Sequence, residues 1–417
     1  VTVTGSLTQT TEYPSIRPVL DLNFAATKSL DRRITFTRDS VGTFTDDMGI
    51  VRLSSNNVPR FDHDPTTGES LGLLIEESRT NQLSSHNGTY VGNYRQTNQG
   101  LNTTGPDGVA NSAREFTPDS NSPTGGNTLI VANTNLGVNG TTKSWSCFLK
   151  VTRSDSIAFR FNDNNNNINS STYTLYANGA DPNLESAGNN GSTTVEKYPN
   201  GWYRFKWQGF VGSSNSSSYL QIYCTSHAST NGSTVGYAIW GQTFESGAFS
   251  TSPILTNGST VTRAQDLAKI TGTNFTDFYN QTEGTAFVHT LMPHSVGAAG
   301  LPAYAFKTSA NSNYYLGFSR DNTGAYHYVK TSNADSYAYE SLVNEYRAVL
   351  GIKTNDLNSY INDANQNVNL STVTLFDADI LHLGSTSTTN VLNGHIKQFK
   401  YYNKRLPDAQ LQGLTQQ

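Results

Sequence analysis

The chain of 417 residues carries little charge. Asp, Glu, Lys and Arg together make up 14% of it, against about a quarter in a typical soluble domain. The formal net charge is −4, and no run of basic residues occurs. Binding to nucleic acid depends on clustered Lys and Arg that contact phosphates. We therefore do not expect nucleic acid to be a partner.

Long apolar runs and cysteines are also scarce. No apolar stretch approaches the ~20 residues that a membrane-spanning helix needs, so we expect no membrane insertion. The first ten residues, VTVTGSLTQT, lack the charged and apolar regions of a signal peptide. The only two cysteines, Cys147 and Cys224, lie inside strand-like runs. This favours two buried free thiols over a disulfide, and either alternative excludes a disulfide scaffold.

What the chain does contain is a long series of short runs with alternating apolar residues. Examples are residues 144–151 (SWSCFLKV), 202–210 (WYRFKWQGF) and 346–353 (YRAVLGIK), separated by turns rich in Gly and Asn. Regularly spaced strands without convincing helices are typical of antiparallel sandwiches. We predict an all-β protein of tandem antiparallel β-sandwiches, of the jelly-roll or concanavalin A-like type.

The end of the chain combines a strand with a short helix. In residues 394–402 (GHIKQFKYY), Phe399 and Tyr401 alternate on one face. A helix is expected to begin near Pro407, with Leu411 and Leu414 three positions apart. This ending resembles the last strand and closing helix of laminin-G-like, concanavalin-type sandwiches.

The predicted divisions follow from these patterns. Residues 1–20 form an extended arm, because Pro14 and Pro18 forbid a helix there, and the arm is expected to lie along a neighbouring subunit or along its own body. The remaining predicted units are a small strand-rich segment at 21–85, a first jelly-roll sandwich at 86–266 and a laminin-G/concanavalin-like sandwich at 271–417.

Two local features of the segment 21–85 lead to specific predictions. Residues 43–50 (TFTDDMGI) indicate a hairpin that turns at 46–49. Further on, Asp62, His63 and Asp64 offer carboxylate and imidazole groups of the kind that bind metals. The favoured interpretation is a turn that begins at Asp64, whose side chain caps backbone amides, and ends at Gly68.

Three stretches resemble the virion proteins of tailed bacteriophages. The first is residues 236–266, in which IWGQTFESGAFSTSPILTNGSTVTRAQD pairs a W-G strand with a T-R-A-x-D tail. The second is residues 34–83, ITFTRDSVGTFTDDMGIVRLSSNNVPRFDHDPTTGESLGLLIEESRTNQL, and the third is NGWYRF at 200–205. In the family, the first of these closes a jelly-roll module.

The resemblance implies a non-enzymatic structural protein on the exterior surface of a phage virion, as a head-decoration or fibre/knob component. Its expected partners are other virion proteins of the capsid or tail, further copies of itself, and host-surface glycans. One alternative is a receptor-binding tail fibre or adhesin. Another is a polysaccharide-degrading enzyme on a concanavalin-like fold.

The last 147 residues contain the candidate residues for glycan binding. Exposed Tyr can stack on a sugar ring while Asn and Asp bind its hydroxyls. The alternative is that Tyr is common in strands simply because aromatic residues favour them. The predicted carbohydrate-binding residues are Tyr314, Tyr315, Tyr326, Tyr328, Asp321 and Asn322.

The sequence contains only weak signals for a catalytic site or a cofactor site. A glycosidase on such a sandwich needs two carboxylates about 5–9 Å apart, and Asp377 with Asp379 is the comparable pair. We favour a turn at the end of a strand there, and predict no enzyme activity. Residues 321–324 and 363–366 could hold Ca²⁺, although hairpin turns account for them equally well. No other cofactor and no metal site is predicted.

Overall fold

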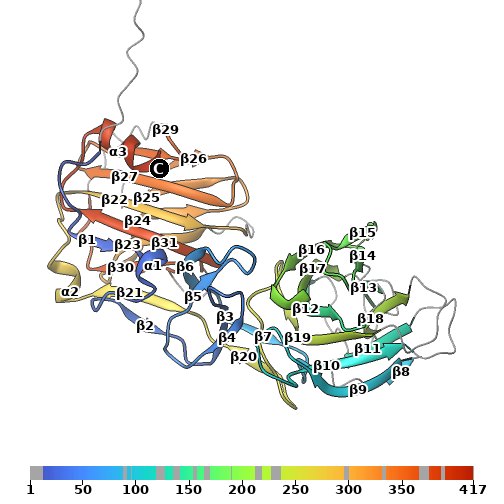
Figure 1. Ribbon diagram of the computed structural model, residues 1–417. Helices are drawn as coiled ribbons and strands as arrows, with labels where there is room; N and C mark the ends of the chain where they lie inside the picture. The colour runs from blue at the N-terminus through green and yellow to red at the C-terminus, as the bar shows by residue number, and fades with distance from the viewer. Residues whose placement is uncertain are drawn as a thin grey trace, which may run out of the picture.

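The computed structural model describes residues 13–87, 92–94, 96–118, 127–134, 141–153, 157–163, 170–188, 190–211, 218–226, 236–294, 300–330, 335–365, 375–386 and 390–416. Over these residues the chain forms two antiparallel β-sandwiches side by side (Figure 1). The predicted fold class is confirmed. The predicted arm lies outside the described residues as far as residue 12, and residues 20–22 already belong to a strand.

The first sandwich consists of two sheets of six described strands each. One sheet has the order β16 (Ser192–Lys197), β17 (Tyr203–Val211), β12 (Thr141–Val151), β19 (Tyr237–Ser246), β10 (Ala113–Pro118), β9 (Gln96–Thr103). The other has the order β15 (Asn183–Ser186), β14 (Thr172–Leu175), β13 (Ile157–Asp163), β18 (Ser218–Ser226), β11 (Asn127–Thr134), β8 (Gly92–Tyr94).

Alternation along β12 accounts for the core of the first sandwich. Trp145, Cys147 and Leu149 point inward and are fully buried, and Trp145 stacks on Phe161 of the opposite sheet with ring centroids 4.3 Å apart. Cys147 is buried, and its Sγ lies 3.4 Å from the carbonyl oxygen of Phe148. The side chain of Cys224 lies outside the described part of the chain.

A bulge in β19 changes which residues face the core. Phe148 pairs with Trp240, but Ser146 pairs with Thr243, so β19 carries one extra residue at this point. Gly241 lies at the bulge and accommodates the extra residue with a φ of +64°, a left-handed conformation that glycine adopts most readily. The W-G-Q sequence of the strand therefore marks the position where its alternation reverses.

The second sandwich also has two sheets. The first has the order β29 (Ala364–Asn365), β28 (Asn358–Ile361), β27 (Glu345–Lys353), β22 (Glu283–Leu291), β31 (Gly394–Tyr402), β6 (Ser70–Ile75), β5 (Phe61–His63), and β1 (Leu20–Leu22) also pairs with β31. The second has the order β2 (Thr35–Thr37), β21 (Leu267–Thr271), β30 (Ile380–Leu383), β23 (Leu301–Thr308), β24 (Asn311–Arg320), β25 (Ala325–Lys330), β26 (Asp335–Glu340).

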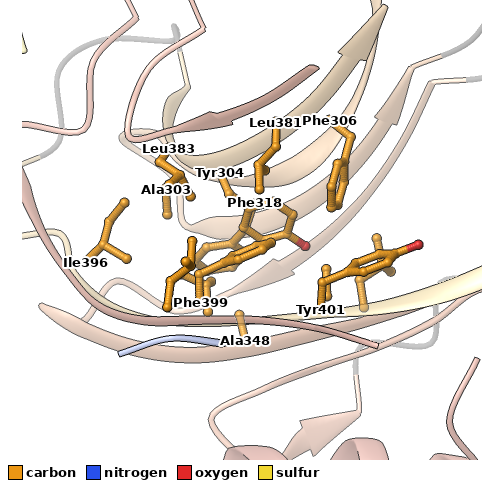
Figure 2. Packing of buried hydrophobic residues seen from close by; sticks show 14 of the residues in the cluster. Ala303, Tyr304, Phe306, Phe318, Ala348, Leu381, Leu383, Ile396, Phe399 and Tyr401 are labelled. Atoms are coloured by element: carbon orange, nitrogen blue, oxygen red, sulfur yellow. The ribbon is translucent and has the colours of Figure 1, made fainter. Parts of the chain in front are cut away.

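Aromatic rings fill the space between these two sheets, as Figure 2 shows. Tyr304 lies 5.1 Å from Phe399 between ring centroids, and Phe306 lies 5.5 Å from Tyr401. All four residues are fully buried. The predicted alternation of Phe399 and Tyr401 in the last strand thus places both rings in the core.

The segment 21–85 does not form a unit of its own. Its strands β1 and β6 both pair with β31, and β2 pairs with β21. Gly72 of β6 allows a close approach, because a Cβ there would lie 2.2 Å from the carbonyl oxygen of Ile396. The predicted division at residue 85 is therefore replaced by a sandwich built from both ends of the chain, seen as blue strands beside orange ones in Figure 1.

Two small sheets and a connecting segment (residues 247–260) lie between the sandwiches. β3 (Gly42–Thr45) pairs with β4 (Val51–Ser54), which confirms the predicted hairpin. β7 (Arg79–Asn81) pairs with β20 (Val261–Arg263). Asn81 donates to the carbonyl oxygens of Gln242 and Ile254 at 2.9 and 2.8 Å, and so holds the connecting segment to β19.

Helices are few and short among the described residues. They are α1 (Phe24–Thr27), the 3-10 turn η1 (Pro199–Gly201), α2 (Thr273–Thr276) and α3 (Asp408–Thr415). α3 begins after Pro407, as predicted, and its Leu411 and Leu414 pack on the outer face of the β22–β27 sheet. No helix within the described ranges is long and apolar enough to span a bilayer.

Candidate functional site

Three of the predicted sugar-binding tyrosines gather on the outer face of the seven-stranded sheet. Tyr315 meets Tyr328 edge to face with ring centroids 4.7 Å apart, and Tyr326 lies 6.0 Å from Tyr328. The ammonium group of Lys330 lies 6.0 Å from the centre of the Tyr315 ring. We call this group, Tyr315, Tyr326, Tyr328 and Lys330, the tyrosine face.

The burial of these rings limits what they can contact. Tyr326 and Tyr328 are 7% and 4% exposed, whereas Tyr315 is half-buried. The interpretation of these tyrosines as sugar-stacking residues requires exposed rings. The structure instead makes Tyr326 and Tyr328 the packed base of the tyrosine face and leaves Tyr315 to offer ring area for stacking.

The remaining predicted sugar-binding residues lie elsewhere. Tyr314 points to the opposite side of the sheet and lies 6.0 Å from Phe376, because consecutive residues of a strand face opposite ways. Asp321 caps the turn between β24 and β25 by accepting from the amides of Thr323 and Gly324 at 2.7 and 3.1 Å. Asn322 is exposed in that turn. The Asp321 carboxylate is therefore used within the hairpin turn at residues 321–324.

Cationic side chains extend the tyrosine face across the sheet. Residues directly opposite each other in the register share a face. His382 lies opposite both Lys269 and Ala305, and Lys307 lies opposite Tyr315. This outer surface therefore joins an aromatic cluster to two lysines and a histidine.

The local environment keeps His382 neutral at neutral pH and leaves the positive charge to the lysines. Burial lowers the pKa of His382 to about 4, and the positive charges of Lys307 and Lys269 act in the same direction. Burial also lowers the pKa of Lys307, whose ammonium donates to the Thr386 carbonyl oxygen at 3.3 Å. An anionic group placed here would relieve this mutual repulsion.

The Asp62–His63–Asp64 stretch adopts the favoured turn. Asp64 accepts from the amides of Thr66 and Thr67, both at 2.8 Å, and the amide of Gly68 donates to its carbonyl oxygen. Asp62 does not join Asp64. Its carboxylate lies 3.0 Å from His395 Nε2 and accepts from the Thr45 amide at 2.6 Å. No group of three metal-binding side chains forms among the described residues.

The carboxylates of the two other acidic candidate sites, Asp377 with Asp379 and the loop at 363–366, also lie in connections between strands. Asp379 caps the start of β30 by accepting from the Ser309 amide at 2.8 Å and from its hydroxyl, while Asp377 is exposed. In the second loop, Asp363 accepts from Gln412 and Gln416 at the end of α3, at 2.8 and 2.6 Å. Residues 366–374 lie outside the described part of the chain.

The most prominent polar constellation is one that the sequence analysis did not predict. Asp266 accepts from Arg38 at 3.0 Å and also forms an ion pair with Arg60. Glu76 pairs with Arg60 at 2.7 Å and with Arg263 at 3.1 Å. The side chains are at most 7% exposed. We call these five residues the buried ion network.

Neutral groups complete the network. The Glu76 amide donates to Asp266 at 2.9 Å, and Ser252 donates to Glu76 through its amide and hydroxyl, both at 2.7 Å. Burial opposes ionisation of Glu76, but Arg263, Arg60 and Ser252 outweigh it and hold the pKa of this carboxyl well below its usual value. Glu76 is therefore ionised at neutral pH.

A second layer ties the network to the first sandwich. Arg79 pairs with Glu77 and donates to the Ser246 carbonyl oxygen at the end of β19. Arg204 of β17 donates to the carbonyl oxygen of Thr251. The sequence signal for the buried ion network is the position of rare charged residues beside apolar strands, in LLIEE and TRAQD. The contacts of Asp266 with Glu76 and Arg38, however, span 190 and 228 positions.

Comparison with known proteins adds little beyond the fold. No protein-family model and no curated protein matches the sequence. Among solved structures, the CBM40 of Ruminococcus gnavus IT-sialidase bound to α2,3-sialyllactose matches over 34% of this chain and 86% of that chain, at 14% identity and a TM-score of 0.27. Trypanosoma rangeli sialidase matches over 59% of this chain and 48% of that chain, at 12% identity and a TM-score of 0.30. These likenesses carry no argument about ligand or activity.

Proposed function

We propose that the protein is a non-enzymatic structural component of the exterior of a tailed-phage virion, which attaches to host-surface glycans. The observation that carries the proposal is the convergence of the three stretches that resemble phage virion proteins. Residues 34–83 supply Arg38, Arg60 and Glu76, residues 236–266 supply Arg263 and Asp266, and residues 200–205 supply Arg204.

The physical role of this convergence supports a structural protein. Buried ion pairs add little net stability, because the desolvation of each charge offsets the attraction. They do penalise any arrangement that separates the partners, since a buried charge without its partner is costly. A joint of this kind suits a surface component that has to keep its two sandwiches in one orientation.

The tyrosine face and its neighbouring cations support the glycan-binding part of the proposal. Tyr315 offers a half-buried ring for stacking, and Lys307 lies beside it in the register. Lysine ammonium groups bind hydroxyls and carboxylates. Glycans with acidic sugars are therefore the expected class.

Immunogold labelling of intact particles tests the virion part. Antibodies against the full chain should decorate the outside of particles produced by a phage that encodes it, at a fixed head or tail position. Labelling confined to host material, with bare particles, would overturn this part of the proposal.

A glycan array with the full-length protein tests the attachment part. We expect binding to acidic glycans, and a loss of at least tenfold in affinity on Tyr315→Ala or Lys307→Ala. Lys353→Ala is the matched control, because Lys353 is exposed at the end of β27 in the other sheet. Equal binding by all three variants would show that this face is not the attachment site.

A further inference from the structure

A cavity of about 230 Å³ lies at the meeting point of the two sandwiches and the connecting segment. The second sandwich contributes Asp62 and His63 from β5 and His395 from β31, the first sandwich contributes Glu196 from β16, and the connecting segment contributes Ser250. The cavity is separate from the tyrosine face, whose residues do not line it.

His63, which lines this cavity, carries a buried acceptor without a partner. The side chain is 5% exposed, and Nδ1 lies 3.1 Å from the Thr45 carbonyl oxygen. A carbonyl can only accept, so Nδ1 carries the hydrogen, and in the neutral ring Nε2 then holds a lone pair. Nε2 is buried without a hydrogen-bond partner. A buried acceptor in this state favours a ligand that brings an O–H or N–H donor.

A second unsatisfied group lies in the connecting segment. Ser250 Oγ is buried without a partner and can both donate and accept. The carboxylates around the cavity, in contrast, are already paired: Asp62 with His395 at 3.0 Å, Glu196 with Lys206, and Glu76 with Arg60 and Arg263. Arg204, which also lines the cavity, donates to the Thr251 carbonyl oxygen, while its Nε is buried without a partner. The cavity therefore offers hydroxyl-type hydrogen bonding rather than a net charge.

The remaining wall is aromatic. Phe249, which is 3% exposed, stacks on His294 with ring centroids 4.0 Å apart and an interplanar angle of 11°. Tyr198, 7% exposed, lines another part of the cavity. An apolar wall opposite a few placed polar groups is the usual composition of a small-molecule site.

We propose that this cavity binds one neutral polyhydroxylated ring, such as a single hexose unit, with a ligand hydroxyl donating to His63 Nε2. The volume corresponds to about eight waters at about 30 Å³ each, and it is below the ~300 Å³ at which pockets for drug-sized ligands begin. It therefore suits a single ring. This inference is independent of the glycan-attachment site proposed above, because it uses no residue of the tyrosine face.

The test uses the full-length protein and free monosaccharides as probes: glucose, galactose, mannose and N-acetylglucosamine. Saturation-transfer NMR and calorimetry should show at least one of them binding with a Kd of about 1 mM or below. Two variants locate the site. His63→Leu removes the acceptor, and Ser250→Phe fills the cavity; each should weaken binding at least tenfold.

Matched controls show whether a bound monosaccharide occupies this cavity. Ser186→Phe places the same ring at an exposed position of the edge strand β15 and should bind as the unmodified protein does. Unchanged tryptophan fluorescence and circular dichroism will show that each variant is folded. If Ser250→Phe does not fold, His63→Leu alone still tests the site. The proposal is overturned if no probe binds, which leaves a water-filled cavity, or if Tyr315→Ala abolishes binding while His63→Leu does not.

Discussion

The two sandwiches are built from the chain in different ways. The described strands of the first come from one continuous piece, between residues 92 and 246, whereas those of the second come from residues 20–75 and 267–402. In the second sandwich β31 lies between β22 from its own half and β6 from the far end of the chain. The first sandwich is therefore a local structure, and the second depends on a contact that closes nearly the whole chain.

The two sandwiches also differ in their spectroscopic probes. All four tryptophans of the chain, at positions 145, 202, 207 and 240, belong to the first sandwich or its turn η1. Tryptophan fluorescence thus reports the first sandwich and its contact with Val51 of β4, while far-ultraviolet circular dichroism reports both sandwiches. This difference allows the two halves to be followed separately in one sample.

The largest expected effect comes from the joint between them. Asp266→Asn leaves Arg38 and Arg60 without one of their carboxylates, and breaking a buried ion pair in this way costs about 3–5 kcal/mol. We expect the free energy of unfolding to fall by this amount in urea titrations. Asp181→Asn is the control, because its pair with Lys197 is exposed and screened by solvent, so no measurable loss of stability is expected. A loss below about 1 kcal/mol for Asp266→Asn would contradict the role given to the network.

Matched leucine substitutions should separate the two sandwiches. Leu73 of β6 and Leu149 of β12 are both fully buried, one in each core. Replacing either by Ala should cost about 2–5 kcal/mol. Leu73→Ala is expected to shift the unfolding transition seen by circular dichroism and to leave the tryptophan transition in place; Leu149→Ala should shift the tryptophan transition. If Leu73→Ala shifts both transitions equally, the two sandwiches unfold as one unit.

The smallest effect expected is a dependence on pH that arises in the second sandwich. His327 is 1% exposed, and burial lowers its pKa to about 3, against about 6.5 in an unfolded chain. Between these values the unfolded chain binds the extra proton, so stability falls as the pH decreases, by up to about 1.4 kcal/mol per pH unit. Well above the unfolded pKa this residue contributes no slope.

His327→Gln tests this contribution, since a Gln amide can replace the contact of 2.6 Å between His327 Nδ1 and Ser359 Oγ. From about pH 7 to about pH 5 the unmodified protein should lose about 2 kcal/mol more stability than the variant. The comparison is made on the circular-dichroism transition, because other acidic groups titrate in both proteins and cancel. Parallel pH profiles would show that His327 is not the group responsible.

Local patterns predicted the elements but not their partners. Alternation placed the strand around Trp145 and the last strand with Phe399 and Tyr401, and Pro407 marked the start of α3, because these signals depend on neighbouring residues. The pairing of β6 with β31 could not be predicted in this way, since nothing in either strand specifies a partner more than 300 positions away.

The same distinction holds for the candidate sites. Alternation by itself places Tyr314 and Tyr315 on opposite faces of a strand, so these two could not belong to one stacking surface. The burial of Tyr326 and Tyr328, however, depends on how the sheet is covered. The buried ion network was missed for a related reason: Arg38 and Asp266 read as ordinary polar residues until the fold brings them together.

The position of β31 has a consequence for synthesis on the ribosome. β1 and β6 emerge early, but their partner emerges only about 380 residues after β1, which at 5–20 residues per second is a delay of about 20–75 seconds. The first sandwich can fold during that interval, while Leu20 and Leu73 have no core to enter. A pause in translation or a nascent chain stalled before residue 394 would therefore leave an aggregation-prone amino terminus beside a finished domain.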